Sequence, residues 1–219
     1  MGYQDIMREY AKKLESYSGK SVDELLAITN GNEIDFIQAI EMAIQQKLER
    51  LGEDNLSEEE VIVLAVEALE REVNNGGYSQ FFVNSSREYT PIIVHALGRI
   101  GCTETAKITE RAVKAAGFSG LAPLTLKDAL DAFSKEYERQ NEYRLVTPAQ
   151  ASEIVKTITS NASLTEPFAV RPNSLSTPEW DVLEEELNEC DQLYYAAGVE
   201  NIGGKLIDFV KANKDAIQP

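Results

Sequence analysis

Histidine and cysteine are scarce in this chain, which limits the chemistry that its side chains can perform. The 219 residues include one histidine, His95, and two cysteines, Cys102 and Cys190, whose positions match no metal-binding or redox spacing. We interpret His95 as a structural or surface residue and Cys102 as a packing residue, because neither has a suitable partner nearby in the sequence. A serine nucleophile at Ser79, Ser85 or Ser86 is disfavoured because the single histidine is distant.

Motifs for catalysis and cofactor binding are also missing. The chain has no P-loop, no glycine-rich dinucleotide fingerprint, no His-Glu-x-x-His helix, no EF-hand loop and no zinc spacing. We therefore predict no catalytic residue, no metal and no cofactor, and a protein that is not an enzyme.

Long apolar runs are absent as well. No segment approaches the roughly 20 apolar residues that a membrane-spanning helix needs. No leader with a charged, an apolar and a small-residue part opens the chain. We expect a cytoplasmic protein with reduced cysteines and no membrane contact.

Basic residues are few relative to acidic ones. The 21 Lys+Arg against 37 Asp+Glu give a formal net charge of −16. Direct binding to nucleic acid is disfavoured because phosphates would be repelled. The acidity either only improves solubility or meets a basic protein partner. A compact chain of this size is about as long as a duplex DNA segment that carries roughly 26 phosphate charges. The net charge of −16 is within a factor of about two of that number, so the protein has enough charge to imitate DNA.

Helix signals dominate the sequence and predict an all-α fold. Ser21 and Ser57 each open a capping box, with Glu24 and Glu60 three residues later. Three Thr-Pro pairs, at 90–91, 147–148 and 177–178, place a capping hydroxyl before a proline suited to the first helical position. Glycines at positions 101 and 117 occupy helix-terminating positions. Helices are expected at 3–17, 22–28, 33–51, 58–74, 91–100, 103–116, 126–142, 148–160, 179–196 and 202–213.

The order of these helices predicts a multi-helix globular domain with an N-terminal helical subdomain. Residues 1–52 form the subdomain, and a polar sequence, LGEDNLSEEE, separates it from the domain at 57–219. Within that domain, residues 161–177 contain two prolines and little periodicity, which predicts a long surface connection.

The acidity is concentrated towards the C-terminus, where residues 173–219 hold ten Asp+Glu against three Lys+Arg. An acidic helix at 179–196 presents carboxylates spaced by about 1.5 Å per residue along its axis, which suits a row of phosphate-like charges. The plain alternative is a solvated helix face. The candidate partner-binding residues of this helix are Glu179, Asp181, Glu184, Glu185, Glu186, Glu189 and Asp191.

A second acidic patch is predicted at Glu58, Glu59 and Glu67. The start of a helix stabilises negative charge through its dipole, so capping also explains the first two of these residues.

Residues 72–86, EVNNGGYSQFFVNSS, combine a glycine turn with aromatic residues that a surface loop has little reason to carry. We predict that the turn ends a helix, that the amides satisfy backbone groups, and that the aromatic rings pack between helices. The residues of this predicted structural motif are Glu72, Asn74, Asn75, Gly76, Gly77, Tyr78, Gln80, Phe81, Phe82 and Asn84.

The order of asparagine, glycine, glutamine and aromatic residues resembles the C-terminal domain of the DNA mimic protein nineteen family. The similarity spans residues 68–113, and the acidic, tyrosine-containing C-terminal end resembles the last helices of that family more loosely. The resemblance implies an all-helical, cytoplasmic bacterial protein that can form a homodimer. It also implies that an acidic surface replaces DNA phosphates on a DNA-binding regulator, such as a helix-turn-helix transcription regulator.

Two other functions fit the same residues. The Asn-Asn-Gly-Gly corner could be a module that binds a peptide or a small polar ligand through its amide side chains. The acidity would equally suit an immunity-like inhibitor of a toxin enzyme. Identification of the captured partner would separate that inhibitor from a DNA mimic.

Overall fold

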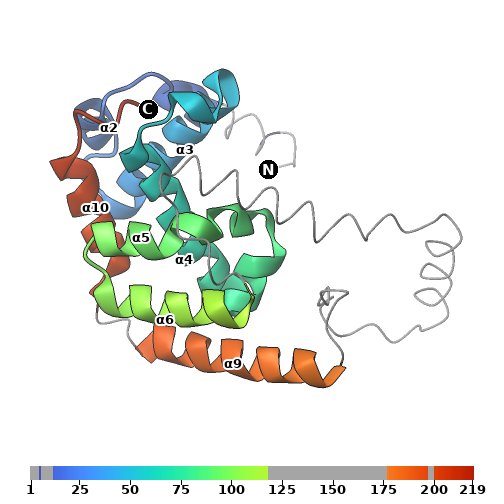
Figure 1. Cartoon of the computed structure of the whole chain (residues 1–219). Helices are drawn as coiled ribbons and strands as arrows, with labels where there is room; N and C mark the ends of the chain where they lie inside the picture. The colour runs from blue at the N-terminus through green and yellow to red at the C-terminus, as the bar shows by residue number, and fades with distance from the viewer. Residues whose placement is uncertain (1–4, 6–11, 118–176, 197–199) are drawn as a thin grey trace, which may run out of the picture.

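The computed structural model describes residue 5 and residues 12–117, 177–196 and 200–219, with the side chains of the third range beginning at residue 182. Within these ranges the regular structure is helical throughout, which confirms the all-α prediction (Figure 1). The α-helices are α2 (Val22–Ile28), α3 (Glu33–Leu51), α4 (Glu58–Val83), α5 (Thr90–Arg99), α6 (Thr103–Ala115), α9 (Thr177–Ala196) and α10 (Ile202–Ala212). The short 3-10 helices are η1 (Glu53–Asn55) and η2 (Ser85–Tyr89).

The observed bounds lie within two residues of those predicted for α2, α3, α5, α6, α9 and α10. Residues 12–17 are helical, as expected for the first segment. The helices predicted at 126–142 and 148–160, the Thr-Pro pair at 147–148 and most of the connection at 161–177 lie outside the described residues.

Helix α4 is the central element, and α3, α5, α9 and α10 all contact it. From Val61 to Leu69 every residue except Glu67 is buried. A helix that is apolar on all sides is stable only when other helices surround it, since each large apolar side chain contributes about 1.5–3 kcal/mol on burial. Helices α5 and α6 lie on one side of α4, and α9 lies along α6 at the edge of the molecule (Figure 1).

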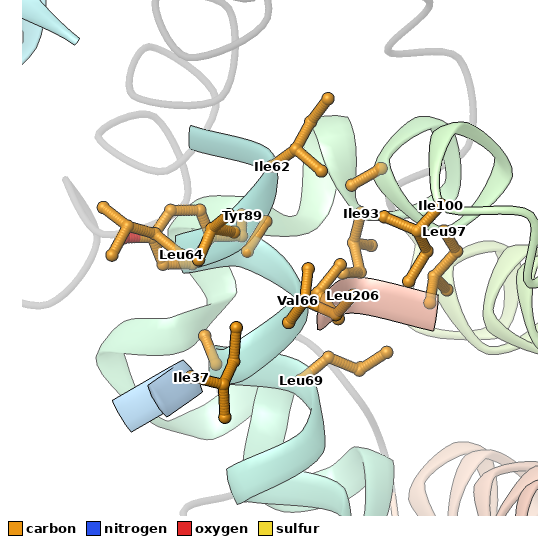
Figure 2. Close-up of a cluster of buried hydrophobic side chains, with 14 of the residues drawn as sticks. Ile37, Ile62, Leu64, Val66, Leu69, Tyr89, Ile93, Leu97, Ile100 and Leu206 are labelled. Atoms are coloured by element: carbon orange, nitrogen blue, oxygen red, sulfur yellow. The ribbon is translucent and has the colours of Figure 1, made fainter. Parts of the chain in front are cut away.

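The buried side chains form one cluster that joins the N-terminal helices to the rest of the described chain. Figure 2 shows Ile37 of α3, Ile62 and Leu69 of α4, Ile93 of α5 and Leu206 of α10 in this cluster. The division into a subdomain at 1–52 and a domain at 57–219 stays a prediction.

The C-terminal residues are held by the fully buried carboxylate of Glu60. This carboxylate accepts hydrogen bonds from Lys47 Nζ at 2.8 Å and from the backbone N–H of Gln218 at 2.9 Å. It also accepts from the backbone N–H of Ser57 at 2.8 Å, which completes the predicted capping box. The ion pair with Lys47 offsets the cost of burying the charge.

The predicted cap at Thr90 is wrong. Tyr89 occupies the N-cap position of α5, and the Oγ1 of Thr90 is buried without a hydrogen-bond partner. Helix η2 runs directly into α5, so Thr90 has helical dihedral angles, φ −50° and ψ −42°. A capping hydroxyl requires an extended backbone at its own residue.

Candidate interaction surface

The Asn-Asn-Gly-Gly corner breaks α4, as the sequence predicts, and a second helical segment follows the break and ends at Val83. Gly76 has φ −162° and Gly77 has φ +76°, and the residues on either side are helical. The positive φ of Gly77 belongs to the region that glycine adopts without strain. The corner therefore ends one helical segment and redirects the chain into the next, in which Tyr78 and Phe81 are buried as predicted.

The side chain of Glu72 connects the two halves of the kinked helix. Its carboxylate accepts hydrogen bonds from Gln80 Nε2 at 2.8 Å, Asn84 Nδ2 at 2.7 Å and Ser86 Oγ at 2.9 Å. Burial alone would raise the pKa of Glu72, but these three hydrogen bonds favour the ionised form and hold the pKa below its ordinary value. Three residues beyond the kink are thus fixed to one residue before it.

The remaining members of the predicted motif divide between core and surface. Tyr78 and Phe81 are fully buried, and the Oη of Tyr78 lies 2.6 Å from Thr109 Oγ1 in a hydrogen bond to α6. Asn74 donates to the backbone carbonyl of Glu70 at 2.7 Å, and both Asn74 and Asn75 are exposed. The ring of Phe82 packs against those of Tyr78 and Phe81.

Helix α9 supplies the cap for the second half of α4. The Oδ1 of Asp191 accepts the backbone N–H of Tyr78, the first residue after the kink, at 2.7 Å. A Cβ at Gly77 would lie 2.2 Å from Asp191 Oδ2, so the contact needs glycine for space as well as for φ. Asp191, which the sequence suggests as a partner-binding residue, lies against the corner.

The inner side of α9 packs on the body through apolar and tyrosine side chains. Leu187, Cys190 and Tyr194 are buried, and the Oη of Tyr194 donates to the Glu70 carboxylate. Tyr195 donates to the backbone carbonyl of Val73 at 2.6 Å. These contacts turn the opposite side of α9 away from the described helices.

The carboxylates predicted to form a row on α9 have three different surroundings. Arg111 of α6 donates through Nε to Glu186 at 2.5 Å and through Nη2 to Glu189. The hydrogen bond from Arg111 lowers the pKa of Glu186. Glu184 and Glu185 are exposed, and neither forms an ion pair within the described part of the chain. The side chains of Glu179 and Asp181 lie outside the described residues.

The second predicted patch is separate from α9 and is partly paired. Glu58 contacts both Arg99 and His95, and Glu59 contacts Arg99 at 3.2 Å. Fifteen residues of helix separate Glu58 from Val73, where α9 touches α4, which is about 22 Å along the axis. The carboxylates of this patch and those of α9 therefore do not form one continuous row.

Glu67, the third member of that patch, is mostly buried between other carboxylates. Burial, together with the nearby charges of Glu41 and Glu70, raises its pKa to about 7 against the opposing effect of Arg71. Arg71 itself donates to Glu41 at 2.6 Å. Glu67 is therefore a carboxyl group that titrates near neutral pH.

Two residues with clear roles were not predicted from the sequence. Besides Arg111, Glu200 accepts the backbone N–H of Thr105 at 2.8 Å and that of Glu104 at 3.2 Å, which caps α6. Arg111 and Glu200 each lie more than 70 positions from the residues that they contact, so no local motif could identify these two roles. In the part of the chain that the structure describes, no group of three or more His, Cys, Asp or Glu residues could hold a metal ion. No described helix is both long and apolar enough to cross a membrane.

Residues 54–154 match the model of a family described as DMP19-like protein, named after DNA mimic protein 19. The match confirms the resemblance that residues 68–113 indicate. It includes α4, α5 and α6, whereas α2, α3, α9 and α10 lie outside it. No curated protein and no solved structure matches the chain.

Proposed function

We propose that this chain, with its match to the DMP19-like protein family, is an acidic interaction protein that occupies a basic DNA-binding regulator in place of duplex DNA. A helix-turn-helix regulator has the required surface, because it neutralises DNA phosphates with Lys and Arg side chains. The formal net charge of −16 gives a long-range attraction towards such a protein.

The observation that supports the proposal most directly is the composition and position of α9. This helix contains seven acidic residues and no basic residue, and it lies at the edge of the described helices (Figure 1). Arg111 neutralises part of one side, which leaves Glu184 and Glu185 as exposed carboxylates. We assign the partner-facing role to these two residues rather than to Asp191, which caps α4.

The corner gives less support to a peptide-binding or ligand-binding module. Asn74, Gln80 and Asn84 each donate a hydrogen bond to a group of α4 itself. Gln80 and Asn84 therefore stabilise the kink through Glu72, and Asn74, Asn75 and Asn84 are exposed.

Reversal of charge on α9 tests the proposal. The chain is used to capture its partner from the native cell at low and at high salt, and the affinity of the purified pair is measured. We expect Glu184→Lys with Glu185→Lys to weaken binding about tenfold or more at low salt, because both changes place a like charge against a basic surface.

The matched control is Glu15→Lys with Glu49→Lys, which changes the net charge equally at two other exposed positions. We expect only a small loss of affinity in this control. A complex that is insensitive to salt, or an equal loss in both variants, would contradict the assignment of a phosphate-like surface to α9.

A further inference from the structure

The side of α9 that faces away from the body carries apolar as well as acidic residues. Val182, Glu185, Glu189 and Leu193 follow one another at intervals of three, four and four residues, so they share one side of the helix. Val182 is 68% exposed and Leu193 is 43% exposed. The two glutamates therefore lie between two exposed apolar side chains.

The apolar exposure on α9 is unusual within the described part of the molecule. Seven large hydrophobic residues are exposed there, and three of them, Val182, Leu193 and Tyr195, lie on this helix. DNA phosphates offer no counterpart to these side chains. Exposed apolar residues that are bordered by charged ones are typical of a protein–protein contact.

The structure also shows how this helix takes a guanidinium group. Arg111 of α6 donates one hydrogen bond to Glu186 and another to Glu189, and these two glutamates are three residues apart. The planar guanidinium group of arginine has several N–H donors in fixed directions, so it fits two carboxylates at this spacing better than the ammonium group of lysine does. Glu189 keeps a side-chain exposure of 54% despite this contact. Glu185 lies four residues before Glu189 on the outer side, about 6 Å along the axis.

We propose that the outer side of α9 binds an arginine-bearing amphipathic helix of the partner. One guanidinium group lies between Glu185 and Glu189, and apolar residues of the partner helix cover Val182 and Leu193. The proposal rests on the proposed function and adds the chemistry of the partner to it. The occupant is a helix because arginine and apolar residues three or four positions apart fall on one helical side and match the alternation on α9.

The proposal divides the binding energy into two parts with different salt dependence. The contact of the guanidinium group with carboxylates weakens as salt screens it. The apolar contact does not depend on screening, because it follows from the removal of apolar surface from water. A purely phosphate-like surface would have the first part alone.

The test uses two synthetic helical peptides as probes against the full chain. The first peptide places arginine and leucine at three-residue and four-residue intervals, and the second has the same arginines with serine in place of every leucine. We expect the first peptide to bind about tenfold more tightly, and this difference to persist at high salt. Glu185→Gln should weaken both peptides at low salt and reduce the salt dependence.

The apolar variant, Val182→Ser with Leu193→Ser, should weaken only the leucine peptide, and equally at all salt concentrations. The matched controls are Glu49→Gln and Ile34→Ser, since Glu49 is exposed and Ile34 is 70% exposed on α3. Neither control should change the affinity. Thermal unfolding of each variant establishes that α9 and the body remain folded.

The outcomes separate this inference from the proposed function. Equal affinity for both peptides, with no effect of the apolar variant, would overturn the inference while salt-dependent binding still supports the proposed function. Absence of salt-dependent binding to either peptide would count against both.

Discussion

At the scale of single residues, the acidic side chains of this protein fall into distinct groups. Glu60 and Glu72 are buried and accept several hydrogen bonds each, whereas Asp191 and Glu200 cap helices. Glu184 and Glu185 are exposed on α9. A formal net charge of −16 therefore overstates what is presented to a partner, because part of the acidity holds helices in place.

Glu67 makes the stability of the protein depend on pH. Its pKa in the folded protein is raised to about 7 from 4.5, so between these values the folded state holds a proton that the unfolded state has lost. Stability therefore falls as pH rises through this window and is constant above it. We expect Glu67→Gln to remove this dependence and to raise the free energy of unfolding at pH 8 by about 1–3 kcal/mol.

Urea unfolding at several pH values measures the effect of Glu67→Gln. The control is Glu49→Gln, which alters an exposed carboxylate on α3 and should leave the wild-type profile unchanged. Parallel pH profiles for the wild type and Glu67→Gln would show that Glu67 ionises normally in the folded protein.

At the scale of helices, the kink of α4 and the position of α9 depend on each other. Tyr78 is the first residue after the kink, and Asp191 of α9 accepts its backbone N–H. Arg111 fixes the other side of α9 through Glu186 and Glu189. The matched family region contains the kink and Arg111, so its residues hold α9 in place even though α9 lies outside the match.

Gly77→Ala tests this dependence. A Cβ there would lie 2.2 Å from Asp191 Oδ2 on a backbone with φ +76°, so we expect a loss of about 2–4 kcal/mol of stability and weaker docking of α9. Gly101→Ala is the matched control, because Gly101 has φ +82° and open space around it. Chemical denaturation of both variants measures the difference.

A similar loss in Gly77→Ala and Gly101→Ala would mean that backbone strain alone accounts for the effect. Addition of Asp191→Ala to Gly77→Ala should restore part of the lost stability, since the clash is removed.

Local features, such as helix caps and turns, could be predicted from the sequence, because they involve residues a few positions apart. Contacts between distant segments could not. The capping boxes at Ser21 and Ser57 involve residues three positions apart, and both are present. The glycine turn predicts the break in α4, and the break is present, but the sequence gives no sign that Asp191, 113 positions from Tyr78, accepts the N–H of that residue. The predicted row of carboxylates on α9 likewise ignores Arg111, which is 75 positions from Glu186.

At the scale of the whole molecule, the described helices share one core and present an acidic helix at one edge (Figure 1). The family match supports a DNA mimic, and the exposed side of α9 supports a basic partner. The family match and the exposed side of α9 are independent observations, because α9 lies outside the matched residues. Together they motivate our proposal that the protein competes with duplex DNA for one surface of a regulator.

A competition experiment with the captured regulator tests whether the protein and duplex DNA bind the same surface. The regulator is loaded with a fluorescent duplex that it binds, and the full chain is added at low salt while the anisotropy of the duplex is followed. We expect the chain to release the duplex completely and the variant Glu184→Lys with Glu185→Lys to release it about tenfold less effectively. A stable complex that contains the regulator, the duplex and this chain together would contradict the account.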